Sequence, residues 1–76
     1  MTLVEKFSQE VNKVGLDFRI TKECNDKFKG ILTDKKTLVE VPYELHKSFQ
    51  LNMLKSHIKW VRNYVDMAIK LRGVAK

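Results

Sequence analysis

Apolar residues recur every three or four positions near the start of the chain, a spacing that predicts a helix over residues 2–14. Thr2 and Glu5 have the spacing of a capping box, in which each side chain accepts a hydrogen bond from a backbone amide of the first turn. Gly15 predicts the end of the helix, because glycine enters the left-handed backbone conformation at little cost. The apolar stripe consists of Val4, Phe7, Val11 and Val14, with Leu3 beside it.

The pattern then changes to a period of two, which is typical of strands with one buried face. Leu16, Phe18 and Ile20 alternate with polar residues and predict a first strand over residues 16–21. A second strand is expected over residues 27–33, after a polar turn. Gly30 within it indicates a β-bulge or a close approach of the backbone.

A third strand is expected over residues 37–41, after the polar loop at residues 34–36. We place its end before Pro42, because proline cannot donate to a ladder but suits the first turn of a helix. The short loops between the three strands predict an antiparallel meander. One face of that sheet should carry the helices and the other should face water.

The stretch from Pro42 to Leu71 has no internal glycine or proline and predicts one long helix. Such a helix of about 30 residues would extend about 45 Å. The expected strands are shorter, so the helix should either overhang the sheet or break near residues 48–52. The predicted fold class is therefore α+β: a helix, a three-stranded antiparallel meander and a long C-terminal helix (αβββα), in one small domain over residues 1–76.

The long helix has two apolar seams, which is more than one small sheet requires. The first comprises Leu51, Leu54, Ile58, Val61, Val65 and Ala68, and the second Phe49, Met53, Trp60, Tyr64, Met67 and Leu71. The second seam is covered either by the first helix or by another subunit. We expect a homodimer that associates through Met53, Trp60, Tyr64 and Met67.

Positive charge is concentrated in the C-terminal part of the chain. The net charge is +6, and from Lys47 to Lys76 the only acidic residue is Asp66. Lys55, Lys59 and Arg62 have helical spacing and predict one basic ridge. No acidic residue lies between positions 45 and 65, so nothing on that segment neutralises the ridge, and Lys35 and Lys36 could extend it.

A basic ridge on a small domain favours a polyanionic partner. We therefore expect a non-enzymatic accessory or regulatory domain that binds nucleic acid through this helix face. The alternative is a protein-binding adaptor or inhibitor that docks on an acidic partner protein through the same helix. Trp60 and Tyr64 could stack nucleobases, but their place in the second seam favours a packing role.

Candidate catalytic and metal-binding residues are few. His46 and His57 are eleven residues apart, which is too far for a metal pair on one helix, and Cys24 is the only cysteine. No nucleophile, base and orienting residue can be combined, so we predict no enzyme activity, no metal and no cofactor. The single cysteine suits a reducing, cytoplasmic setting, and no apolar run is long enough to span a membrane.

The order of helix, three strands and helix resembles that of double-stranded RNA-binding domains. The resemblance is limited to this order. The histidine that the family carries between its first two strands has no counterpart in the turn at residues 23–26. The family's lysine cluster at the start of the last helix is also missing, since residues 42–48 contain only Lys47. The resemblance therefore implies a topology but no residue roles.

Overall fold

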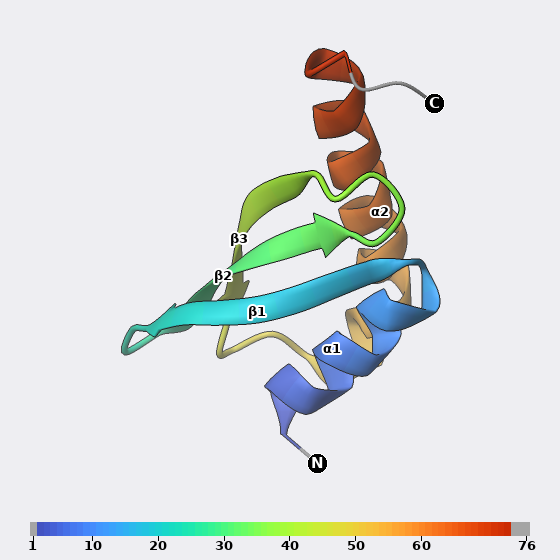
Figure 1. Ribbon diagram of the computed structural model, residues 1–76. Helices are drawn as coiled ribbons and strands as arrows, with labels where there is room; N and C mark the ends of the chain where they lie inside the picture. Colours follow the sequence, from blue (N-terminus) through green and yellow to red (C-terminus); the bar gives the residue numbers. More distant parts are fainter. Residues whose placement is uncertain (1, 74–76) are drawn as a thin grey trace.

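The computed structural model describes residues 2–73, and both of its helices pack on the same face of a three-stranded sheet (Figure 1). This layout confirms the predicted αβββα order of an α+β fold. The elements are α1 (Leu3–Lys13), β1 (Leu16–Glu23), β2 (Lys27–Asp34), β3 (Glu40–His46), a short 3₁₀ helix η1 (Leu51–Met53) and α2 (Leu54–Leu71).

Helix α1 begins and ends where the sequence predicts. The Thr2 hydroxyl accepts from the Glu5 amide at 3.2 Å, and the Glu5 carboxylate accepts from the Thr2 amide at 2.9 Å. This reciprocal pair is the capping box. Gly15 ends the helical turn with φ 81°, as expected for the left-handed conformation.

The sheet has the strand order β1-β2-β3 with both pairs antiparallel, which confirms the meander. Gly30 on β2 lies opposite an irregularity in β1, where the register shifts between Ile20 and Lys22. A Cβ atom at Gly30 would lie 2.4 Å from the carbonyl oxygen of Arg19 and 2.7 Å from the Phe18 ring. Both features that Gly30 predicts, a bulge and a close backbone approach, are therefore present.

The predicted end of the third strand is wrong. Strand β3 extends over Glu40–His46 and includes Pro42, which lies opposite Ile31 of β2. The Asp34 amide donates to the Val39 carbonyl at 3.0 Å. The backbone N–H and C=O groups of the odd-numbered residues in this segment therefore point toward β2. The Pro42 nitrogen therefore points away from β2, along the outer edge of the sheet, where no ladder bond is lost.

The predicted start of the long helix at Pro42 is wrong for the same reason. After β3 the chain turns at residues 47–48, passes through η1 and enters α2 at Leu54. The non-helical segment between β3 and η1 overlaps residues 48–52, where a break in the predicted helix was expected. Helix α2 has 18 residues and a length of about 27 Å.

Alternate residues of the strands meet both helices in one core. Phe7 of α1 lies between two rings of the sheet, edge-on to Phe18 at 5.0 Å and stacked on Tyr43 at 5.2 Å between centroids. The first seam of α2 is buried as predicted at Leu54, Ile58, Val61 and Val65. Leu51 precedes the helix and is 49% exposed, so it does not continue the buried seam.

Candidate functional site

Helix α2 has two flanks with different chemistry on either side of its buried seam. On one flank the Tyr64 hydroxyl donates to the Pro42 carbonyl at 2.9 Å, which sets this side of the helix against the outer edge of β3. On the other flank Arg62 donates to the Val14 carbonyl at 3.0 Å, which sets that side against the end of α1. The first flank is apolar and aromatic, and the second is basic.

Arg62 joins three parts of the chain on the basic flank. Besides Val14, its guanidinium donates to the Asp34 carboxylate at the end of β2, at 3.1 Å, and to Asp66 on its own helix, at 3.0 Å. Arg62 is nevertheless neutralised, because its partners Asp34 and Asp66 both lie outside the acid-free segment between positions 45 and 65. Arg62 is a structural bridge and not part of a free basic ridge.

Asp34 anchors the loop between β2 and β3. Its carboxylate is 4% exposed and also accepts from the Lys36 amide at 2.9 Å. Burial alone would raise the pKa of the Asp34 carboxyl, but the bonds from Lys36 and Arg62 outweigh burial and hold its pKa below the ordinary value. The burial of Asp34 could be inferred from the sequence. Alternate residues of a strand lie on the same face, and Asp34 alternates with Gly30 and Leu32, which lie on the covered face.

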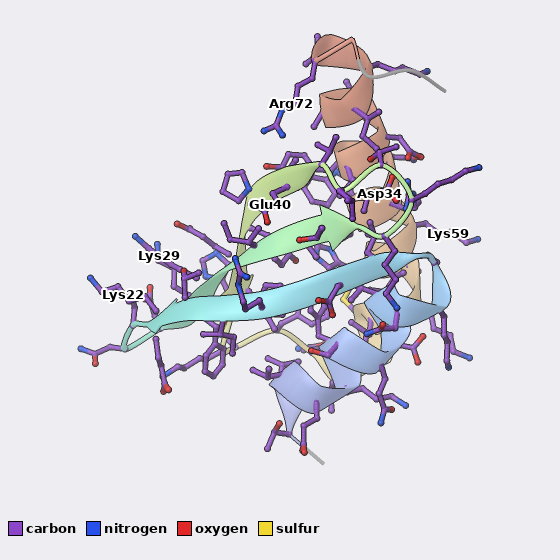
Figure 2. All side chains as sticks on the ribbon, in the orientation of Figure 1. Lys22, Lys29, Asp34, Glu40, Lys59 and Arg72 are labelled. Carbon is purple, nitrogen blue, oxygen red and sulfur yellow. The ribbon has the colours of Figure 1, made fainter. Side chains whose placement is uncertain are left out.

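The remaining predicted basic residues lie around this bridge. Lys55 and Lys59 are exposed on α2, two turns and one turn before Arg62 respectively, and Lys36 is exposed in the loop. None of these three forms an ion pair with any residue between positions 2 and 73. The Lys35 ammonium donates to the Asn12 side chain of α1, a neutral partner that leaves its charge intact. Figure 2 shows Lys59 pointing outward, on the opposite side of the molecule from Lys22 and Lys29.

Basic and acidic residues are balanced in one part of the fold and unbalanced in another. Residues 16–33 and 40–47 contain five basic and five acidic residues. This range is the sheet with its first turn, without Asp34 of β2, which pairs with Arg62 of α2, and with Lys47, which follows β3 and pairs with Glu23. Several of these are paired, as in Lys47–Glu23 at 2.7 Å and Lys27–Glu44 at 3.2 Å. The other described segments, with both helices and the β2–β3 loop, contain nine basic and four acidic residues. The positive surplus of the described chain therefore lies entirely in its helical layer and this loop.

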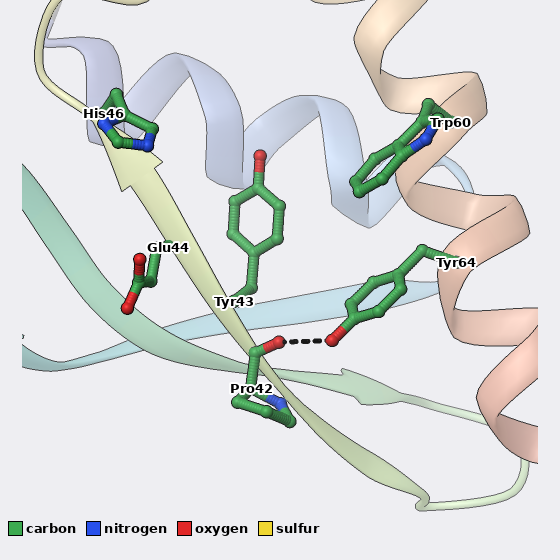
Figure 3. A pocket seen from close by; sticks show the side chains of 6 residues that line it. All are labelled: Pro42, Tyr43, Glu44, His46, Trp60 and Tyr64. Carbon is green, nitrogen blue, oxygen red and sulfur yellow. Dashed lines mark hydrogen bonds between the residues drawn. The ribbon is translucent and has the colours of Figure 1, made fainter.

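The apolar flank of α2 borders an open groove of ≈ 420 Å³ against β3. Its lining is drawn in Figure 3, with Trp60 and Tyr64 from the helix facing Pro42, Tyr43, Glu44 and His46 from the strand. The ring of Trp60 is nearly parallel to those of Tyr64 and His57, with centroids 5.5 Å apart in both pairs. Trp60 is therefore part of a row of aromatic rings along this flank of α2.

The second seam is not covered by α1. Met53, Trp60 and Met67 are 57%, 56% and 63% exposed, whereas Tyr64 is partly buried by its contact with Pro42. An uncovered row of large apolar residues on a small domain is typical of an interaction surface. Of the two coverings that the sequence left open, the first helix is therefore excluded.

The two histidines have different surroundings. His57 lies between the rings of Phe49 and Trp60, and its Nε2 forms a hydrogen bond with the Tyr43 hydroxyl. Burial lowers the pKa of His57 and raises the pKa of Tyr43 to about 12. His46 is exposed at the end of β3.

Cys24 is partly buried beside the β1–β2 turn. Between positions 2 and 73, no three His, Cys, Asp or Glu side chains lie close enough to hold a metal ion. No helix in this part of the chain is long and apolar enough to cross a membrane. No protein-family model, no curated protein and no solved structure matches the chain.

Replacing Arg62 by methionine should destabilise the protein by about 3 kcal/mol, because the buried Asp34 carboxylate loses its charged partner. Urea unfolding at neutral pH measures the difference. Lys59→Met, the same change at an exposed position one turn away, should alter the free energy of unfolding by no more than about 0.5 kcal/mol. Equal effects of the two substitutions would contradict the bridging role of Arg62.

Acidification should weaken the fold through His57. Because burial lowers the pKa of His57 in the folded state, its contribution to stability is complete above about pH 6.5 and declines as the pH falls below that value. Unfolding measured at about pH 7.5 and about pH 5.5 should differ by about 1 kcal/mol more in the natural protein than in His57→Gln. An identical difference in both proteins would refute this role.

Proposed function

We propose that the protein binds the phosphate backbone of a nucleic acid through a lysine surface formed by Lys55, Lys59, Lys35 and Lys36. The single observation that carries the proposal is the separation of charge, with a balanced sheet and a positive surplus of five on the helical layer and loop. Phosphate contacts are made most readily by lysines that are not already paired, and among residues 2–73 these four lysines have no ion-pair partner. We infer an accessory or regulatory role for such a binding domain.

The bridge made by Arg62 supports this surface without being part of it. By binding Asp34 and Val14 together, Arg62 keeps the β2–β3 loop and the end of α1 beside α2. Lys35 is fixed near the same place by its bond to Asn12 and by its amide, which donates to the Gly15 carbonyl at 3.0 Å. Lysines from separate elements are therefore held on one rigid support, which lowers the entropy lost on binding.

Exchanging Lys55 and Lys59 for glutamine should weaken binding about tenfold, because each lysine is expected to contact one phosphate. The slope of the logarithm of affinity against the logarithm of salt concentration should become shallower by about 2. The assay is fluorescence anisotropy with labelled duplex and single-stranded oligonucleotides at about 50 and about 200 mM salt. The matched control is the double variant Arg19→Gln with Lys22→Gln, which removes the same charge from exposed positions of β1.

An equal loss in both double variants would mean that net charge, not this surface, governs binding. Absence of any binding at low salt would contradict the proposal and would leave an acidic protein surface as the partner of the same lysines.

We also propose that the apolar flank of α2 packs against a second copy of the chain. Its residues are separated alternately by four and three positions, the spacing of a helix–helix seam: Met53, His57, Trp60, Tyr64, Met67 and Leu71. No charged residue occurs in this row. The row is bordered toward solvent by Ser56, Asn63 and Lys70. The first two are small or neutral and permit the close approach of another helix, and the charged Lys70 lies at the C-terminal end of the row.

An antiparallel two-fold arrangement suits this seam best. It would place the two sheets on one side of the helix pair, because a two-fold axis in the interface plane preserves that side. The basic flank of each copy, with Lys55 and Lys59, would lie at the outer edge of the dimer, away from the interface. The pairing therefore keeps the lysine surface of each copy free.

Met67→Glu should raise the dissociation constant of the dimer about a hundredfold, because it places a charge in the apolar seam of both copies. Sedimentation velocity across a range of concentrations measures this. Leu38→Glu, which adds the same charge at an exposed apolar residue of the β2–β3 loop, outside the seam, should leave the dimer intact. A natural protein that stays monomeric at about 100 μM, a concentration at which even a weak dimer would be populated, would refute self-association.

A further inference from the structure

The loop between β2 and β3 presents a leucine in an unusual conformation. Leu38 has φ 64°, and the structure has no other residue besides glycine at positive φ between positions 2 and 73. Its side chain is 72% exposed, while the adjacent Val39 is 8% exposed and belongs to the core. A bulky residue is disfavoured in the left-handed region, where glycine or asparagine would be accommodated easily.

The loop holds this leucine rigidly. The Leu38 amide donates to the Asp34 carbonyl at 2.7 Å, and the Asp34 amide donates to the Val39 carbonyl at 3.0 Å. The Asp34 carboxylate is in turn bound by the Lys36 amide and by Arg62 of α2. The Leu38 side chain therefore cannot fold back onto the core without breaking this network. A leucine at this position stabilises neither the core nor the turn. We therefore attribute its presence to an interaction with another molecule.

The surroundings of Leu38 favour one kind of partner. Lys35 and Lys36 belong to the same turn, so the loop offers an apolar tip beside two cations. A nucleic-acid duplex is complementary to such a tip, because its stacked bases are apolar and its phosphates lie on both sides of them. Leucine is among the side chains that proteins insert between base steps from the minor groove, which bends the duplex.

We propose that Leu38 is a wedge that inserts between base pairs of a duplex while Lys35 and Lys36 contact the flanking phosphates. The inference rests on the proposed nucleic-acid function and narrows its ligand to double-stranded, bendable nucleic acid. The lysines of α2 contribute affinity for both single-stranded and double-stranded nucleic acid. Leu38 contributes the preference for a duplex and bends that duplex.

The test uses Leu38→Asn, because asparagine accepts positive φ and lacks the apolar tip. This variant should unfold a few degrees above the natural protein, since it relieves backbone strain. Its affinity for a labelled duplex should fall about fivefold to tenfold, while its affinity for a single strand of the same sequence should stay unchanged. Energy transfer between dyes at the two duplex ends should report less bending. Leu51→Asn removes an exposed leucine that lies outside both the loop and the apolar row of α2, and it serves as the matched control.

Several outcomes separate this inference from the function on which it rests. Unchanged duplex affinity and bending in Leu38→Asn would overturn the wedge and leave the lysine surface standing. Failure of the natural protein to bind either oligonucleotide would overturn both. Anionic phosphatidylglycerol vesicles form the last arm: vesicle binding that depends on Leu38, with duplex binding that does not, would overturn the wedge in favour of a lipid surface.

Discussion

The contact between Arg62 and Asp34 determines how the layers of this protein fit together. The two charges come from α2 and from the end of β2, and the same guanidinium reaches the last turn of α1 through the Val14 carbonyl. Apolar packing alone would permit α2 to slide or rotate over so small a sheet, because its buried row consists of similar aliphatic residues. A buried, directional pair restricts it to one register. Such a pair adds little net stability, but losing one partner is costly, and in this way it can favour a single arrangement.

Local signals in the sequence predicted much of the fold. The capping box at Thr2 and Glu5, the glycine that ends α1 and Gly30 opposite the bulge all act within a few residues or across one strand pair. The failures occurred where a residue's role depends on distant neighbours. Pro42 was assigned to the start of a helix, although it lies in β3. A proline is tolerated there because β3 is at the edge of the sheet, and that position depends on how the whole sheet is arranged. Arg62 resembled a free cation because its partner, Asp34, is 28 residues away along the chain.

The same reasoning explains which parts of the candidate site could be foreseen. Helical spacing placed Lys55 and Lys59 on one side of α2 and the second apolar seam on another, since both depend on the geometry of a single helix. Spacing could not reveal that the first turns of the predicted helix were a strand, or that β3 would leave Trp60 and Met67 uncovered. The positive φ of Leu38 was also beyond prediction, because a leucine carries no preference for that conformation.

These features together distinguish the sheet, whose charges are largely paired, from the helical layer and its loop, which carry the surfaces that we propose for binding. The sheet neutralises its own charges in cross-strand pairs such as Lys27–Glu44. The helical layer and its loop instead retain unpaired lysines, an uncovered apolar row and a strained leucine, each of which lowers the stability of an isolated chain. A domain of this size has little stability in reserve. The lysines and the strained leucine lie near the Arg62–Asp34 pair and the apolar row lies on the other flank of α2, so the proposed partners would offset these costs at two separate surfaces.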